Sequence, residues 1–398
     1  MAFPKRFSNL PDYAFPRLRQ LLDSHAPGGA PIHMTIGEPR HKMPDFVAPI
    51  LAAHIDGFNR YPPNDGTPEL LAAISGWIKR RYGVAVADTR LMALNGTREG
   101  LFNAAVALAP EQKNGQTPLV LMPNPFYQVY TVAAVTTGAE PLYVPATAQT
   151  GFLPDYAALP AETLNRVTLA YLCSPANPQG AVASRDYWAT LLALAEKHDF
   201  IIFADECYCE IWRNAPPVGI LQVAAEVGAD PERVFAFHSL SKRSNLPGLR
   251  SGFVAGGEMG VAQIRKLRAF AGAPLPLPIQ HVSQAAWQDE AHVTANRALY
   301  QEKFALAAQI FSGLPGFVVP EGGFFLWLPV EDGETAAVKL WRETGVRVLP
   351  GAYLSRDVAN SAGKSGQNPG NPYVRVALVA QKEEMQRGLI QLRDCLYR

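Results

Sequence analysis

The strongest constraint on the fold is an alternation of short apolar runs with longer helical patterns between about residue 90 and residue 256. Runs rich in Val, Ile, Leu and Phe that helices separate are typical of a mostly parallel β-sheet covered by helices on both faces. Ligands of such sheets bind beyond the carboxyl ends of the strands, so a functional site is expected in the loops that follow them. The strands are expected at Thr117–Met122, Glu140–Val144, Val167–Cys173, Phe200–Ala204, Val234–Phe237 and Gly252–Ala255, with helices among them at Arg98–Leu108 and Asp186–His198.

The pattern changes after about residue 280, which fits the two domains that 398 residues suggest. A helical tract at 281–311 precedes strand-like runs at Gly316–Val319, Phe324–Leu328, Val346–Leu349 and Val374–Val379, and a helix is expected at 382–396. We therefore expect an N-terminal arm that joins the small domain (1–45), a large α/β domain (46–285) and a small α+β domain (286–398). The composition of Asp357–Pro372 favours a mobile loop.

Composition excludes several classes of function. The formal net charge is +1 without a basic block or an acidic tail, so neither nucleic acid nor a membrane surface is an expected partner. No apolar run reaches the length of a membrane span, and the N-terminus does not resemble a secretory signal. The eight histidines show no metal-binding spacing, so no metal is expected. The four cysteines lack a C-x-x-C pair and are expected to be reduced thiols of a cytoplasmic protein.

One loop concentrates polar groups between two apolar runs. The stretch SLSKRSNLPGLR (239–250) places Ser239, Ser241, Lys242 and Arg250 between strand-like segments that both head for the core. Lys242 by itself could be an ordinary surface lysine, which is the common fate of lysines. A lysine amine that is desolvated among other cations is, however, the usual arrangement for a Schiff-base nucleophile.

Three further stretches lie at strand ends, and each has an ordinary structural explanation. Asn95–Gly100 opens a helix that Thr97 could cap, and the free N–H groups of its first turn could bind an anion. Asn177 lies between two prolines in a tight turn, which does not require its amide to face a ligand. Asp205, with Tyr208 three residues on, could be a helix cap or a carboxylate held in a cleft to fix a cation.

Together these stretches share one edge of the predicted sheet. An anion cradle, a buried carboxylate, a tyrosine, an asparagine and a lysine are the groups that pyridoxal 5′-phosphate requires. The missing G-x-G-x-x-G and P-loop patterns weigh against a dinucleotide or a nucleoside triphosphate. The sequence therefore predicts a site for pyridoxal phosphate.

The chain resembles the class I/II aminotransferases of the fold-type I pyridoxal-phosphate enzymes over nearly its whole length. Ser239-x-Ser241-Lys242 with Arg250, Ala204-Asp205-Glu206-x-Tyr208 and Asn177-Pro178-x-Gly180 carry the resemblance. It implies a mostly parallel, seven-stranded type of sheet sandwiched by helices, together with a smaller α+β domain. It also implies transamination between amino acids and 2-oxo acids in a homodimer with shared active sites.

The resemblance assigns a role to each matching residue. Lys242 would carry the cofactor aldehyde and move the substrate's α-proton, Asp205 would keep the ring nitrogen protonated, and Tyr208 and Asn177 would hydrogen-bond the ring oxygen. Gly37, Asn177 and Arg375 would bind substrate, with Arg375 at its carboxylate. The remaining cofactor-binding residues are expected to be Gly96, Thr97, Arg98, Ser239, Ser241 and Arg250 around the phosphate, Tyr127 on the ring, and Tyr61 from the neighbouring subunit.

The most detailed expectation concerns the identity of the substrate. Gly37–His41 and the run Ser239–Gly256 look most like the succinyldiaminopimelate aminotransferases, which implies N-succinyl-diaminopimelate with glutamate and 2-oxoglutarate. Arg40, Arg98 and Arg243 are candidates for its distal end. Aspartate or another amino acid is the alternative substrate, and a pyridoxal-phosphate C–S lyase is the alternative reaction. A cofactor-binding regulator is disfavoured because no basic N-terminal domain is present.

Overall fold

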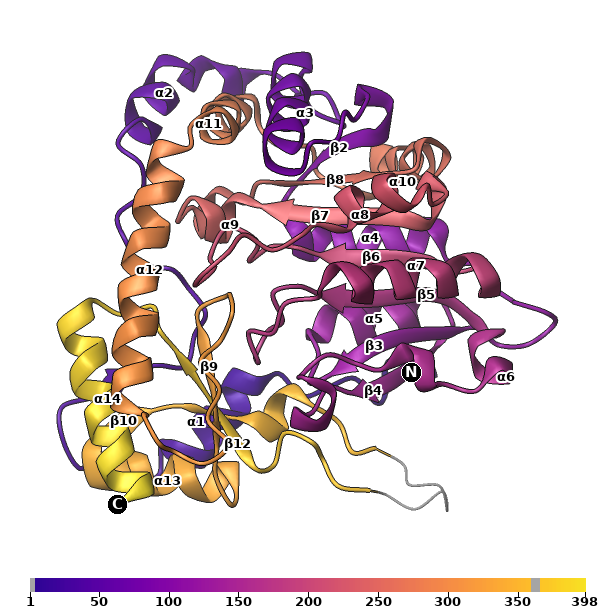
Figure 1. Ribbon diagram of the computed structural model, residues 1–398. Coiled ribbons are helices and arrows are strands. Elements are labelled where there is room, and N and C mark those ends of the chain that lie inside the picture. The colour runs from indigo at the N-terminus through magenta and orange to yellow at the C-terminus, as the bar shows by residue number, and fades with distance from the viewer. Residues whose placement is uncertain (1–3, 359–365) are drawn as a thin grey trace.

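The largest element of the computed structural model, which describes residues 4–358 and 366–398, is a seven-stranded sheet of order β2-β8-β7-β6-β5-β3-β4 (Figure 1). The strands are β2 (Leu91–Leu94), β3 (Leu119–Asn124), β4 (Glu140–Pro145), β5 (Val167–Cys173), β6 (Ile201–Asp205), β7 (Val234–Ser239) and β8 (Gly252–Gly256). Strands β3 to β7 are parallel, whereas β8 runs antiparallel to both β7 and β2. The predicted mostly parallel sheet is confirmed. Strand β2 is missing from the predicted set because a run of four residues without β-branched side chains suits a helix equally well.

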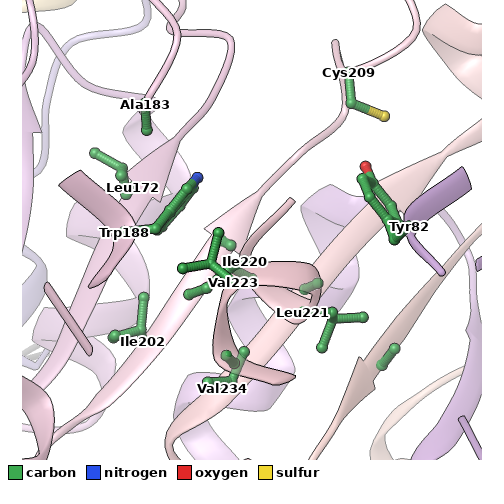
Figure 2. Packing of buried hydrophobic residues seen from close by; sticks show 14 of the residues in the cluster. Tyr82, Leu172, Ala183, Trp188, Ile202, Cys209, Ile220, Leu221, Val223 and Val234 are labelled. Carbon is green, nitrogen blue, oxygen red and sulfur yellow. The ribbon is translucent and has the colours of Figure 1, made fainter. Parts of the chain in front are cut away.

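Helices cover both faces of this sheet. One face packs against α3 (Pro68–Tyr82), α7 (Arg185–His198) and α8 (Ile220–Val227), behind which lies α11 (Leu277–Gln288). The other face packs against α4 (Thr97–Leu108), α5 (Gln128–Thr136) and α10 (Glu258–Ala271). Figure 2 shows Trp188 of α7 beside Ile220 and Val223 of α8, above the strand residues Ile202 and Val234. Burial on both faces explains why the strands read as continuous apolar runs.

A smaller α+β part lies beside the carboxyl ends of the strands. Its three-stranded antiparallel sheet consists of β11 (Leu349–Pro350), β12 (Tyr373–Ala377) and β9 (Phe325–Pro329), and β1 (Ile32–His33) pairs in parallel with β10 (Val346–Arg347). Its helices are α1 (Ala14–Leu22), α12 (Ala291–Ile310), α13 (Gly333–Thr344) and α14 (Lys382–Tyr397). Helix α12 runs from the end of α11 down into this part (Figure 1). The remaining α-helices are short: α2 (Val47–Ala53), α6 (Ala161–Leu164) and α9 (Leu240–Arg243).

Two expectations for the C-terminal third need correction. The tract at 281–311 is two helices, since α11 ends at Gln288 and α12 begins at Ala291. Gly316–Val319 is irregular, because Gly316 has a φ of 76°, which an extended strand does not allow.

Of the expected mobile loop at Asp357–Pro372, residues 359–365 lie outside the described residues. The domain boundaries at residues 46 and 286 remain a prediction. Within the described ranges, no helix combines the length and the apolar character needed to cross a membrane.

Candidate active site

A cleft of about 910 Å³ opens between the carboxyl ends of the large sheet and the smaller part. Most of the predicted site residues line it, which confirms that the strand-end loops converge on one place. These lining residues are Gly37, Thr97, Arg98, Tyr127, Asn177, Asp205, Tyr208, Ser239, Ser241, Lys242, Arg250 and Arg375.

Lys242 extends into this cleft from the short helix α9 that follows β7. The hydroxyl oxygen of Ser239 begins α9 by accepting the Ser241 N–H at 3.0 Å. The Lys242 Nζ donates to the carbonyl oxygen of Gly37 at 2.5 Å. Burial lowers the pKa of Lys242 to about 8, and the positive charges of Arg375 and Arg250 act in the same direction. The amine is therefore deprotonated far more readily than an ordinary lysine, as a nucleophile or general base requires.

Asp205 ends strand β6 and is 5% exposed. The Tyr130 hydroxyl donates to its Oδ2 at 2.8 Å, and the Cys207 N–H donates to its Oδ1 at 3.4 Å. Burial raises the pKa of Asp205, and these hydrogen bonds lower it. Among the described residues, no cation lies within ion-pair distance of the Asp205 carboxylate, although buried carboxylates usually have such a partner. The site therefore suits a cation supplied by a ligand.

A concave surface formed by backbone and guanidinium lies at the start of α4. Gly96 precedes this helix with a φ of 79°, and a Cβ at this position would lie 2.3 Å from the Arg250 Nη2. Arg250 itself has a φ of 53°, and its Nη1 donates to the Pro247 carbonyl oxygen at 2.8 Å. No side chain in the described part of the chain caps α4, so the N–H groups of its first turn are available to an anion. The suggested cap by Thr97 is wrong, because Thr97 is the first residue of α4 and Gly96 occupies the capping position. The Thr97 hydroxyl instead contacts the Cys207 Sγ at 2.9 Å.

Arg375 approaches the cleft from β12 of the smaller part. Its Nη1 donates to the Asn177 Oδ1 at 3.2 Å, and its Nη2 donates to the Thr35 carbonyl oxygen at 2.7 Å. Its Nε is buried without an acceptor, and burial lowers the pKa of the guanidinium to about 10. No carboxylate of the described residues pairs with it. A buried guanidinium in this state suits a carboxylate that arrives with a ligand.

Two tyrosines complete the walls. The Tyr127 hydroxyl accepts from the Arg98 Nε at 2.7 Å. Tyr208 packs edge-on against Phe324, with ring centroids 5.3 Å apart, and burial raises the pKa of its hydroxyl well above the usual value. Both rings are thus held in place before any ligand enters.

Other candidates lie elsewhere. Tyr61 is 100% exposed and outside the cleft. Arg243 is buried against Trp77 and Trp287 and pairs with Glu290 at 2.8 Å, so it is unavailable to a substrate. Arg40 lies 4.0 Å from a carboxylate oxygen of Glu384 and does not line the cleft. Of the three arginines proposed for the distal end, only Arg98 does.

Several contacts in the cleft are not predictable from the sequence. Tyr130 is one, since a buried tyrosine of an apolar helix gives no sign that its hydroxyl meets a carboxylate. The carbonyl groups of Thr35 and Gly37 are others, because backbone acceptors leave no trace in residue type. Cys207, which contacts Thr97, lies two residues after the predicted site residue Asp205. That position alone could have indicated that Cys207 lines the cleft.

Pyridoxal phosphate and an amino-acid substrate would suit this cleft. The pKa of the Lys242 amine is lowered to about 8, the first turn of α4 offers N–H groups, and the buried Asp205 and Arg375 have no ion-pair partner among the described residues. A family model described as aminotransferase class I and II matches residues 30–387. The chain therefore belongs to the class I and II aminotransferases, which use pyridoxal phosphate to transfer amino groups between amino acids and 2-oxo acids.

Similar proteins cover the chain from end to end. It is 31% identical to the LL-diaminopimelate aminotransferase of Desulforudis audaxviator, over 99% of this chain and 98% of that one. An aminotransferase structure from Neisseria meningitidis has 36% identity, a TM-score of 0.93 and complete coverage of both chains. A structure from Thermus thermophilus, described as a probable N-succinyldiaminopimelate aminotransferase, has 25% identity and a TM-score of 0.82, covering 97% and 98% of the two chains.

Proposed function

We propose that this aminotransferase acts on an amino dicarboxylic acid of the diaminopimelate type, with glutamate and 2-oxoglutarate as the partner pair. The sequence favours the N-succinylated form, and the similarity to LL-diaminopimelate aminotransferases supports the free LL form as the second candidate. The observation that carries the proposal is the position of Arg98 on the wall of a large cleft that also holds Arg375. In a long substrate with two anionic ends, each end would have one of these two cations as a partner.

In this proposal different cleft residues bind different parts of the cofactor. When bound, pyridoxal phosphate supplies an electron sink for negative charge at the substrate's α-carbon. Lys242 would provide the amine that holds the cofactor through its aldehyde, and the same amine would take and return the proton at that carbon. Asp205 holds a proton on the ring nitrogen, while Tyr208 and Asn177 donate to the ring oxygen. Ser239, Ser241, Arg250, Thr97 and the N–H groups after Gly96 hold the phosphate, with Tyr61 supplied by a second subunit.

Gly37 and Arg375 form the substrate side of the proposal. The Arg375 guanidinium would bind the α-carboxylate with a fork of two hydrogen bonds, and Tyr127 would contact the cofactor ring. The four cysteines are unpaired, which supports a reducing, cytoplasmic location. The reaction would then serve lysine and cell-wall synthesis.

The test compares amino donors. The ratio kcat/KM is measured for N-succinyl-LL-diaminopimelate, LL-diaminopimelate, aspartate, alanine and an aromatic amino acid, each with 2-oxoglutarate. We expect one of the two diaminopimelate donors to exceed the others by more than tenfold, which corresponds to about 1.4 kcal/mol of transition-state discrimination. Preference for aspartate or an aromatic donor by the same margin would remove the substrate proposal and leave the aminotransferase assignment intact.

A further inference from the structure

The segment 35–41, called the strap here, touches both halves of the site. The Thr35 carbonyl oxygen accepts from Arg375 at 2.7 Å, and the Gly37 carbonyl oxygen accepts from Lys242 Nζ at 2.5 Å. The strap has no regular secondary structure of its own. Its position therefore depends on what fixes its two ends.

The first end is tied to the smaller part through strand pairing. The Met34 N–H donates to the Arg347 carbonyl oxygen at 3.0 Å, and the Met34 carbonyl oxygen accepts from the Ala377 N–H at 2.8 Å. These are backbone contacts, so they do not depend on side-chain identity. At the other end, the Arg40 carbonyl oxygen accepts from the Gln381 Nε2 at 3.3 Å, and among the described residues no backbone–backbone pairing holds this end.

The second end is fixed by the side chain of His41 against α12. The His41 Nδ1 lies 2.9 Å from the Asn296 Oδ1, and its Nε2 lies 2.7 Å from the Lys303 Nζ. The ring also packs on Tyr300, with centroids 4.6 Å apart. Asn296, Tyr300 and Lys303 are four and three residues apart and share one face of α12. His41 is thus held at both ring nitrogens and on its face.

Lys303 makes this arrangement unusual. It is 3% exposed, and its Nζ also donates to the carbonyl oxygens of Leu378 at 3.1 Å and Ala380 at 2.7 Å. All three ammonium donors are therefore used, yet within the described residues no carboxylate pairs with it. Burial lowers its pKa to about 8, with a further contribution from Arg40. Because Lys303 donates to Nε2, the Nδ1 of His41 carries the proton and donates to Asn296.

The same asparagine connects this anchor to the cleft. The Asn296 Nδ2 donates to the backbone carbonyl oxygen of Lys242 at 3.4 Å. Lys242 is thus contacted at its backbone by Asn296 and at its amine by Gly37. We propose that His41, fixed between Asn296 and Lys303, is a positioning residue that holds the strap over Lys242 and keeps its amine out of water. This inference rests on the proposed role of Lys242 as the reacting amine.

The test follows the Lys242 amine directly in the full-length protein freed of cofactor. The extent of reductive methylation at Lys242 is measured by mass spectrometry as a function of pH. Burial is the largest cause of the lowered pKa of Lys242, so releasing the strap admits water and moves the midpoint from about 8 upward, by about one unit. We expect this rise for His41→Phe, which keeps the ring packing on Tyr300 but loses both hydrogen bonds.

Two variants serve as controls. His41→Gln retains an acceptor and a donor and is expected to restore most of the wild-type midpoint. The side chain of Lys42, the next residue in the chain, is 80% exposed. Lys42→Met removes its charge and is expected to leave the midpoint of Lys242 methylation unchanged. If His41→Phe does not fold, Lys303→Gln takes its place, with the same expected rise.

An unchanged midpoint in the folded variant, or an equal rise in Lys42→Met, overturns the positioning role. The outcome is separable from the proposed function: borohydride reduction of the holoenzyme shows independently whether the cofactor is bound to Lys242. If it is attached there and the midpoint does not move, only the role of His41 fails.

Discussion

Asp205 is the residue whose surroundings are least complete without a ligand, since its carboxylate is buried, receives hydrogen bonds from Tyr130 and Cys207, and has no cation partner among the described residues. We expect Asp205→Ala to bind pyridoxal phosphate but to lose about 10²–10³-fold in kcat, because the cofactor ring would lose its charge partner. Single-turnover measurements with the preferred donor check this, and cofactor retention is followed by absorbance. Near-normal turnover would refute the proposed role.

Arg375 is the other residue that lacks a charge partner among the described residues. Arg375→Lys keeps the charge but loses the planar fork, so we expect kcat/KM to fall about 10- to 100-fold while the cofactor dissociation constant stays unchanged. Steady-state kinetics and a cofactor titration measure the two quantities separately. An equal loss of cofactor binding would place Arg375 at the phosphate instead.

The sequence predicts correctly that a residue lies in the cleft when the adjacent strand fixes its position at the end of the sheet. Asp205 ends β6, and Lys242 lies in the helix directly after the neighbouring strand β7, so their shared place in the cleft is predictable. Arg243 shows the limit, because its charge gives no sign that two tryptophans and Glu290 hold it away from the cleft. Side-chain direction depends on packing partners far away in sequence, which composition does not reveal.

At the level of elements, the start of α4 depends on the absence of a side chain at Gly96. A Cβ there would lie 2.3 Å from the Arg250 Nη2, and the φ of 79° disfavours any L residue. We expect Gly96→Ala to displace Arg250 and weaken cofactor binding about tenfold or more, in addition to a loss of about 1 kcal/mol in stability. The cofactor dissociation constant and the free energy of unfolding are measured together.

Gly83, at the end of α3, provides the matched control. Its φ of 73° is similar, but no atom of the described residues lies within 4 Å of a Cβ at that position. Gly83→Ala is expected to cost a similar amount of stability and to leave cofactor binding unchanged. If both variants lose cofactor equally, backbone strain alone explains the effect and the contact with Arg250 is irrelevant.

Helix α12 contains a buried lysine whose charge should make stability depend on pH. The pKa of Lys303 is about 8 in the folded chain, against an ordinary value of 10.5. Between these two pH values the unfolded chain binds more protons, so the contribution of Lys303 to stability grows as pH rises. We expect the free energy of unfolding of the wild type, relative to Lys303→Met, to rise from pH 8 to pH 10.5. Urea titrations at several pH values test this, and a flat difference would contradict the lowered pKa.

The elements themselves are predictable to different degrees. Strands β5 and β7 are found because a long apolar run between helices leaves few alternatives. The gap between α11 and α12 escapes prediction, since Asp289 and Glu290 suit a helix and only the change of direction toward the smaller part ends it. Strands of two residues such as β1 carry too little pattern to be seen.

At the scale of the whole molecule, the ring of Tyr61 is fully exposed, and we propose that a second copy of the chain covers it. We expect a homodimer in which Tyr61 of each subunit completes the phosphate site of the other. Mixing Tyr61→Phe with Lys242→Ala subunits should produce heterodimers with one intact site and one doubly impaired site, so activity should exceed that of both parents. No gain despite subunit exchange, verified by native mass spectrometry, would argue against shared sites.

The pairing of β1 with β10 has a consequence for how the protein is made. Ile32 pairs with Val346, the Met34 carbonyl oxygen accepts from the Ala377 N–H, and the Thr35 carbonyl oxygen accepts from Arg375. Contacts this distant in sequence close large loops and form late. A nascent chain that stops short of β12 holds every strand of the large sheet, whose parts can fold as a unit. It still cannot position Thr35, so the ribosome must release nearly the entire polypeptide before catalysis can begin.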